Sequence, residues 1–297
     1  MRTAFFAVAF VSCLGLPARQ TPGLPAQQTP GPSAHPTLLR PFQVSPSASV
    51  AQDLGISTVR IDYHRPAVKG RKIWGELVPY GQVWRAGANE ATAISFSDPV
   101  KIDGKDLPAG TYAFFAIPGK DEWTLIFNRE AKQWGAFNYH AGQDALRIQV
   151  KPAVRPAQEY LGYTIQVTSP ERLRVELAWE NLAVGFDLAM EVQSSYWAYL
   201  TRTLAGAGPD EWQPLNQAAG YCLASGTHLD RAMDWVDQSL RIKEGFKNLE
   251  LKARLLHRSG RTREAIPFLD RALEQAAAAK AAPSYLAELE QLRKDWN

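Results

Sequence analysis

The residues best suited to chemistry gather between Tyr63 and Thr92, in the stretch YHRPAVKGRKIWGELVPYGQVWRAGANEAT. Histidine and glutamate transfer protons, arginine and lysine bind carboxylates or phosphates, and tryptophan can stack on a sugar ring. We therefore expect a ligand site here, completed by an aromatic loop further along the chain. The candidate ligand-binding residues are His64, Arg65, Lys69, Arg71, Trp74, Tyr80, Trp84, Arg85, Asn89, Glu90, Trp134 and His140.

Each of these residues also has a structural interpretation. Aromatic side chains under a long loop bury apolar area and reach a hydrogen-bond partner with their polar tips. Clustered charges on a loop form exposed ion pairs, which contribute less than about 1 kcal/mol each. The stretch is thus either a binding surface or a long connection anchored by its aromatic residues.

A catalytic role would use Glu90 with His64 or His140, and Asp144 is a further residue of the right type. The chain has no close pair of the His-x-x-x-His kind, no phosphate-binding loop signature and no G-x-S-x-G motif. We therefore predict no metal and no cofactor, and the sequence leaves open whether the protein is an enzyme and which residues would be catalytic.

Short runs of alternating apolar and polar residues must position these side chains. In STVRIDY, Val59 and Ile61 fall on one face, whereas Arg60 and Asp62 fall on the other. About nine such runs between Gly and Pro signals, without an intervening helical pattern, predict an antiparallel sandwich or barrel. We expect an all-β antiparallel sandwich domain over residues 47–192. The stretch from Tyr63 to Thr92, called the dense stretch below, and the loop around Trp134 should meet at one end of it.

From about residue 193 to 297 the apolar period becomes helical. Two segments, around Gly226 and Gly260, can be superimposed at an offset of 33 or 34 residues. The pattern resembles tetratricopeptide repeats, so we predict a small all-α helical-repeat segment after the sandwich. Such a segment either caps a sheet or binds a partner through its concave face.

The N-terminus has the order of parts found in a secretory signal. Arg2 precedes a short apolar run that ends in small residues, which predicts a signal peptide over residues 1–18. Residues 19–46 are rich in Pro and Gln and predict a disordered linker. We expect an exported protein, periplasmic or extracellular. Lipoprotein anchoring at Cys13 is an alternative, and it is the only case in which we expect a membrane partner.

Composition narrows the classes of partner. Lysine and arginine number 33 against 30 aspartate and glutamate, so the charge gives no reason to expect nucleic acid. After cleavage of the signal, Cys222 is the only cysteine, and no intramolecular disulfide can form. The expected partners are a small polar ligand, a glycan or a protein.

A resemblance covers roughly residues 47–191. The dense stretch, followed by LPAGTYAFFAIPGKDEWTLIFN and DALRIQVKP, resembles a family of exported bacterial proteins classified as domain of unknown function 2911. The resemblance implies a fold and export, and it brings no reaction or ligand. In that family the positions of His64 and His140 often carry Ser and Asp, which argues against a mechanism that depends on either histidine.

These observations favour an exported binding or interaction module with a ligand site in the loops of the sandwich. The first alternative is a hydrolase or metal-assisted enzyme that uses Glu90 with His64 or His140. The second is an assembly protein that binds partners through its helical tail.

Overall fold

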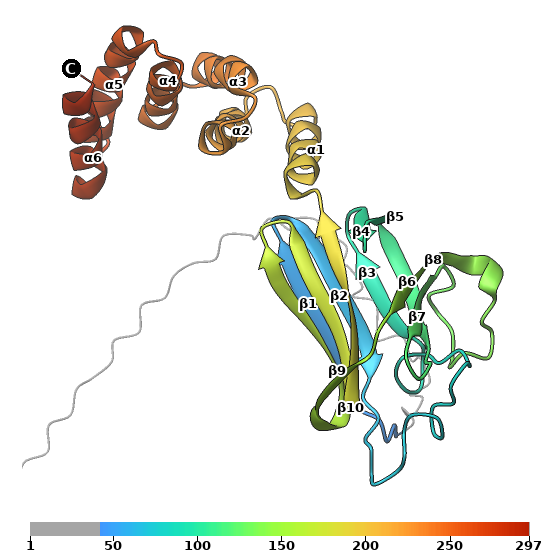
Figure 1. Ribbon diagram of the computed structural model, residues 1–297. Coiled ribbons are helices and arrows are strands. Elements are labelled where there is room, and N and C mark those ends of the chain that lie inside the picture. The colour runs from blue at the N-terminus through green and yellow to red at the C-terminus, as the bar shows by residue number, and fades with distance from the viewer. Residues whose placement is uncertain (1–41, 297) are drawn as a thin grey trace, which may run out of the picture. The chain divides into compact units, whose positions relative to one another are not determined.

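The computed structural model describes residues 42–296, and these form ten strands followed by six helices (Figure 1). The expected antiparallel sandwich followed by helices is therefore confirmed. The predicted signal peptide, most of the linker and Cys13 lie outside the described residues. The strands are β1 (Ser47–Leu54), β2 (Ser57–His64), β3 (Thr92–Phe96), β4 (Val100–Ile102), β5 (Lys105–Leu107), β6 (Gly110–Ile117), β7 (Trp123–Asn128), β8 (Asp144–Val150), β9 (Ala153–Ser169) and β10 (Arg172–Met190).

The first sheet has six antiparallel strands in the order β1, β2, β3, β6, β7, β8. Strand β2 shows how the sequence builds it, because its buried residues alternate with more exposed ones along its length. Val59 and Ile61 are fully buried in the core, whereas Arg60 lies on the opposite face. The period of two thus assigns one face of β2 to the core and the other to the outside.

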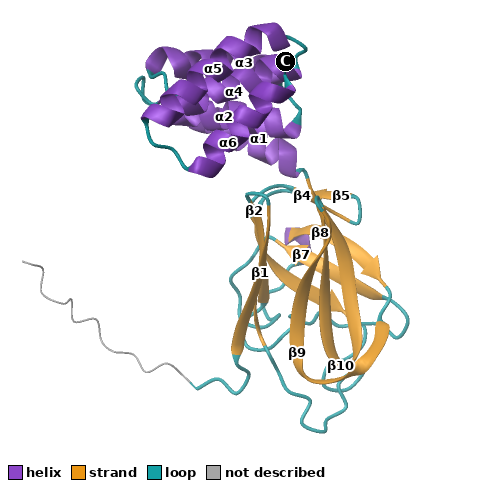
Figure 2. Cartoon of the chain, turned by 90° about the vertical axis from the view of Figure 1, so that its left-hand side faces the viewer, coloured by secondary structure: helices purple, strands orange, loops and turns teal. Residues whose placement is uncertain are grey.

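The second sheet has four strands in the order β5, β4, β10, β9. Its main part is the long hairpin of β9 and β10, with irregular register around Glu180, which has a positive φ of 55°. Figure 2 shows the two long strands side by side. The two sheets enclose one hydrophobic core, as expected for sheets that pack face to face.

Four tryptophans form one cluster in this core. Trp74 and Trp84 come from the connection between β2 and β3, Trp123 opens β7 and Trp179 lies in β10. The ring centroids of Trp74 and Trp123 are 4.8 Å apart, and those of Trp84 and Trp179 are 6.0 Å apart. Indole rings from the long connection therefore fill the space between the sheets and fix that connection to the core.

The outer face of the six-stranded sheet is covered over β6 and β7. Ala113 and Phe115 of β6 and Ile126 of β7 face away from the main core and form a second buried cluster. Ile117 of β6 packs against it, and Val83, Ala91, Ala136 and Tyr139 come to it from the connections 65–91 and 129–143. These two loops thus lie over one half of the outer face, and a groove is found beside them over β1, β2 and β3.

The helices are α1 (Val192–Ala205), α2 (Trp212–Ser225), α3 (Leu229–Ile242), α4 (Phe246–Arg258), α5 (Thr262–Ala278) and α6 (Pro283–Asp295). The turn after α2 holds Gly226 and the turn after α4 holds Gly260, each with a positive φ. Ala232 of α3 and Ala265 of α5 are fully buried, so that small residues lie inside each helix pair. No helix within residues 42–296 is long and apolar enough to cross a membrane.

Candidate functional site

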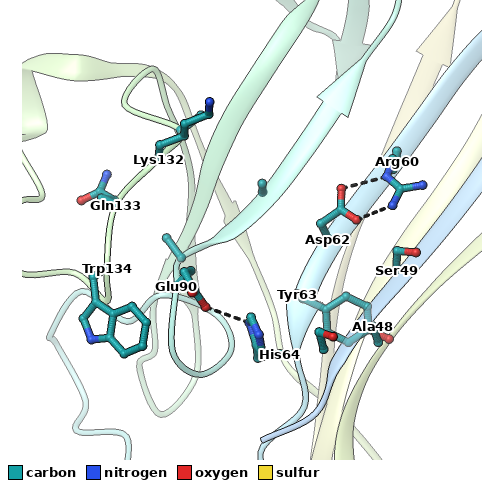
Figure 3. A pocket seen from close by; sticks show the side chains of 14 residues that line it. Ala48, Ser49, Arg60, Asp62, Tyr63, His64, Glu90, Lys132, Gln133 and Trp134 are labelled. Atoms are coloured by element: carbon teal, nitrogen blue, oxygen red, sulfur yellow. Dashed lines mark hydrogen bonds and ion pairs between the residues drawn. The ribbon is translucent and has the colours of Figure 1, made fainter. Parts of the chain in front are cut away.

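The groove beside the two loops has a volume of about 810 Å³ and is open to solvent. Its floor is the outer face of β1, β2 and β3, and one wall comes from residues 131–134 (Figure 3). A volume of this size is in the range of small-molecule sites. The lining residues are Ser47, Ala48, Ser49, Arg60, Asp62, Tyr63, His64, Glu90, Ala91, Ala93, Ala131, Lys132, Gln133 and Trp134.

Arg60 and Asp62 form a bidentate ion pair on the floor. Arg60 Nε donates to Asp62 Oδ2 at 2.8 Å, and Arg60 Nη2 donates to Asp62 Oδ1 at 2.6 Å. The two residues are two positions apart on β2, so they share its outer face. The hydrogen bond and the charge of Asp62 raise the pKa of Arg60. About half of each side chain is exposed, which leaves polar atoms of both available to a ligand.

His64 and Glu90 form a second pair at one end of the groove. His64 Nδ1 lies 3.4 Å from Glu90 Oε2, with 15% of the histidine side chain and 49% of the glutamate side chain exposed. His64 is the last residue of β2, while Glu90 lies two residues before the start of β3. The sheet therefore places a group that can carry a proton beside a carboxylate that can accept one.

A tight turn sets the position of Glu90. Ala86 and Asn89 adopt positive φ angles of 50° and 57° within it. The carbonyl of Ala86 accepts hydrogen bonds from the Tyr163 hydroxyl at 2.7 Å and from Thr92 Oγ1 at 3.0 Å. Because both donors are buried, this turn is fixed by the core.

Trp134 lies on the wall of the groove that is formed by the second loop, residues 129–143. Glu90 and Trp134 form an isolated antiparallel bridge, with Ala91 N donating to Gln133 O and Gly135 N donating to Asn89 O, each at 3.0 Å. Trp134 is 54% exposed, and it is the only exposed tryptophan in residues 42–296. The structure thus joins the stretch 63–92 to the aromatic loop, over the outer face of the sheet and beside the end at which β2 stops and β3 begins.

Asp144 fixes the base of the second loop. Only 8% of its side chain is exposed, and it accepts hydrogen bonds from Asn128 Nδ2 at 2.7 Å, Tyr139 OH at 2.8 Å and Arg147 Nε at 2.6 Å. Burial, followed by the bond to Asp144, raises the pKa of Tyr139, and the bond to Asp144 raises the pKa of Arg147. This carboxylate therefore serves a structural purpose and does not line the groove.

Three of the predicted basic residues fix the first loop, residues 65–91, to the second sheet or to itself. Arg65 Nε donates to the carbonyl of Leu161 at 2.8 Å, and Lys69 N donates to Glu159 Oε1 at 2.9 Å. Arg71 donates to the carbonyls of Val68 and Ala67. None of the three lines the groove.

The remaining predicted residues are also outside the groove. Trp74 and Trp84 are buried in the tryptophan cluster, and Tyr80 packs beside Gly75, where an added Cβ would lie 2.7 Å from its ring. Arg85 has a buried Nε without an acceptor among the described residues, and burial lowers its pKa. Asn89 donates to the carbonyl of Ser45 at 3.4 Å.

His140 is exposed and is not among the residues that line the groove. Its carbonyl accepts a hydrogen bond from Asn128 Nδ2 at 3.1 Å. Of the pairings considered for catalysis, the geometry thus brings together Glu90 and His64 and does not bring His140 to them. Residues 42–296 contain no group of three His, Cys, Asp or Glu side chains arranged to hold a metal ion.

Sequence reasoning named three of the lining residues as ligand-binding candidates, His64, Glu90 and Trp134. It did not name the floor or most of the wall, although the alternation in β2 already assigned Arg60 and Asp62 to the outer face. Another signal was the run of consecutive apolar residues in β6, because a strand that is apolar on both faces must be covered on both. That run predicts a cover over the sheet, and the groove lies at the edge of this cover.

The model of the family described as "Protein of unknown function (DUF2911)" matches residues 45–188. The sandwich part of the chain matches the DUF2911 family. The DUF2911 match includes every residue that lines the groove. Comparisons with curated proteins and with solved structures gave no match.

Proposed function

We propose that this protein is a binding module and that its ligand, a small polar molecule, occupies the groove on the outer face of the six-stranded sheet. One observation carries the proposal. An exposed indole, Trp134, stands beside two polar pairs whose geometry is fixed by strands and by a buried turn. Exposing an indole forgoes the stabilisation that burial would bring, and such a side chain is well suited to ligand contact.

A thermal-shift screen of the full chain with sugars, nucleotides, amino acids and metal ions tests this proposal, because a ligand that binds the folded state raises its melting temperature. Ala93 lies on the groove floor, so Ala93→Phe fills the groove without entering the core. We expect a ligand that stabilises the wild type to have no effect on Ala93→Phe. Ligands that stabilise both proteins equally, or no ligand at all, would refute the proposal.

A hydrolase that uses Glu90 with His64 is the second candidate, favoured by the 3.4 Å approach of the two side chains. A ligand found in the screen is incubated with the wild type and with Glu90→Gln, and its breakdown is followed by chromatography. Turnover by the wild type that is lost in Glu90→Gln supports the enzyme. An intact ligand after long incubation supports simple binding.

An assembly role for a tetratricopeptide-like tail is the third candidate. A cavity of about 330 Å³ spans α2, α4 and α6, and Asn216 Oδ1 at this cavity is buried without a donor among the described residues. An extended peptide could supply that donor from its backbone. Gly220 lines the same cavity, so Gly220→Trp should abolish peptide binding without affecting the groove of the sandwich.

We also propose export across the cytoplasmic membrane, on the basis of the N-terminal sequence pattern. N-terminal sequencing of the protein from the producing cell tests it. A mature chain that begins after residue 18 supports export, and a chain that retains Met1 contradicts it.

A further inference from the structure

Most of the charged side chains that line the groove are already paired within it. Asp62 neutralises Arg60 through two hydrogen bonds, and Glu90 lies beside His64. Lys132 is the one lining lysine or arginine without a carboxylate partner among the described residues. The carboxylates of Asp62 and Glu90 balance the charges of Arg60 and Lys132, so the lining has no excess of positive charge to attract a carboxylate or a phosphate. The groove is therefore poorly suited to an anion and better suited to an uncharged polar ligand.

The paired groups still offer hydrogen bonds. Two parallel bonds to Arg60 leave lone pairs on both oxygens of Asp62, and Glu90 Oε1 is not engaged by His64. Gln133 does not add to these groups, because its Oε1 is buried, with no donor among residues 42–296, and its Nε2 donates to the carbonyl of Glu130. Fixed acceptors next to the N–H groups of Arg60 match hydroxyl groups, since a hydroxyl donates and accepts at once.

The groove has two aromatic residues in its lining, of which Tyr63 is buried in the core and only Trp134 is exposed. The lining alanines add little apolar surface, because Ala48 packs against the core and Ala91 is buried in the cluster over β6 and β7, which leaves Ala93 on the floor. Trp134 adds an exposed indole on the wall opposite the pair of Arg60 and Asp62 (Figure 3). A ligand that fits must have an apolar face for the indole and a polar edge for the floor. A pyranose ring has both, because its C–H groups gather on one face while its hydroxyls point outward from the edge.

We propose that the groove binds a neutral carbohydrate, with one sugar ring against Trp134 and neighbouring hydroxyls bound by Arg60, Asp62 and Glu90. This inference rests on the proposed binding function and narrows its ligand to one chemical class. Because the groove is open to solvent, a saccharide chain can extend beyond the ring that contacts Trp134. A neutral oligosaccharide should therefore bind more tightly than its monosaccharide.

The test is calorimetric titration of the full chain with cellotetraose, maltotetraose and the tetramer of N-acetylglucosamine, alongside inorganic phosphate, glutamate and glucuronate. Trp134→Ala removes the ring, and Phe137→Ala is the matched control, since Phe137 is an 83% exposed aromatic on the same loop that does not line the groove. We expect at least one tetrasaccharide to bind the wild type and Phe137→Ala equally, and to bind Trp134→Ala at least about 10-fold more weakly.

Iodide quenching of tryptophan fluorescence gives a second readout. Trp134 is the most exposed tryptophan among the described residues, so a bound saccharide should reduce the quenching of the wild type. The quenching of Trp134→Ala should not change when the saccharide is added. Near-UV circular dichroism verifies that the variant is folded.

Failure of the carbohydrate inference can be distinguished from failure of the proposed binding function. If phosphate, glutamate or glucuronate binds and Ala93→Phe blocks it, while no neutral saccharide binds, the carbohydrate inference is overturned and the binding function stands. Saccharide binding that is unaffected by both Trp134→Ala and Ala93→Phe overturns the inference, because the sugar then lies elsewhere. No binding of any probe in this titration or in the wider screen overturns both proposals.

Discussion

Asp144→Ala should destabilise the sandwich strongly, although Asp144 does not line the groove. The carboxylate is 8% exposed and accepts hydrogen bonds from Asn128, Tyr139 and Arg147. The substitution leaves the donors of Asn128 and Tyr139 without this acceptor, and each lost hydrogen bond lowers the free energy of unfolding by about 1 to 1.5 kcal/mol. Arg147 is 44% exposed, so its ion pair adds less than about 1 kcal/mol. The expected decrease in the free energy of unfolding is therefore about 3 kcal/mol.

The assay is urea unfolding followed by near-UV circular dichroism, which reports on the four buried tryptophans of the sandwich core. Far-UV ellipticity at 222 nm follows the helices in the same samples. Asp106→Ala is the matched control, because Asp106 also forms an ion pair with a basic residue, Lys101, but is 83% exposed. This control should change the free energy by less than about 0.5 kcal/mol. A decrease below about 1 kcal/mol for Asp144→Ala would show that the loop is not fixed by this carboxylate.

Four further predictions concern the core and the helices. Tyr163→Phe removes the donor to Ala86 and should cost about 1 kcal/mol at pH 8. Burial raises the pKa of Tyr163, so the stability that its neutral form contributes is fully present below the unfolded-state pKa of about 10 and is lost as the pH rises toward the folded-state value. The free energies of unfolding of the wild type and Tyr163→Phe, measured from pH 8 to 11, should therefore converge above about pH 10. A difference that stays constant with pH would contradict a role of the Tyr163 hydroxyl. Gly87→Ala places a Cβ 2.8 Å from Thr92 Oγ1 and 3.2 Å from the carbonyl of His64. In urea unfolding it should lower the free energy of unfolding by about 1 to 3 kcal/mol. Gly220→Ala, with no atom within 4 Å of the new Cβ in helix α2, should instead leave stability unchanged or increase it. The Cys222 thiol is fully buried and its pKa is raised by burial, so in a Cys13→Ser chain it should react with Ellman's reagent only after unfolding, and fast reaction of the native protein would contradict its burial.

The sequence by itself determined the fold class and the orientation of individual strands. Alternation in β2 assigned Val59 and Ile61 to the core and Arg60 and Asp62 to the outer face, and the structure has this arrangement. The change to a helical period near residue 193 likewise marks the end of the strands, since α1 begins at Val192. These features are local, because periods of 2 and 3.6 follow from backbone geometry alone.

Only the tertiary structure decided which aromatic residues belong to the core. Trp74, Trp84 and Trp134 all lie in irregular connections near glycines, yet the first two are buried and the third is 54% exposed. An irregular loop has no period that relates a residue to a face. Burial there depends on which sheet the loop covers, and this is a property of contacts distant in sequence.

The tertiary structure also decided where the candidate site lies. The sequence predicts that the loops meet at an end of the sandwich, and it does not predict that they also fold over Phe115 and Ile126 on the outer face of the sheet. The apolar outer residues of β6 and β7 require a cover, and covering them stabilises the fold by removing apolar area from water. The polar outer residues of β2 need no cover. The groove therefore lies over Arg60 and Asp62, at the boundary between the covered and the uncovered half of one sheet.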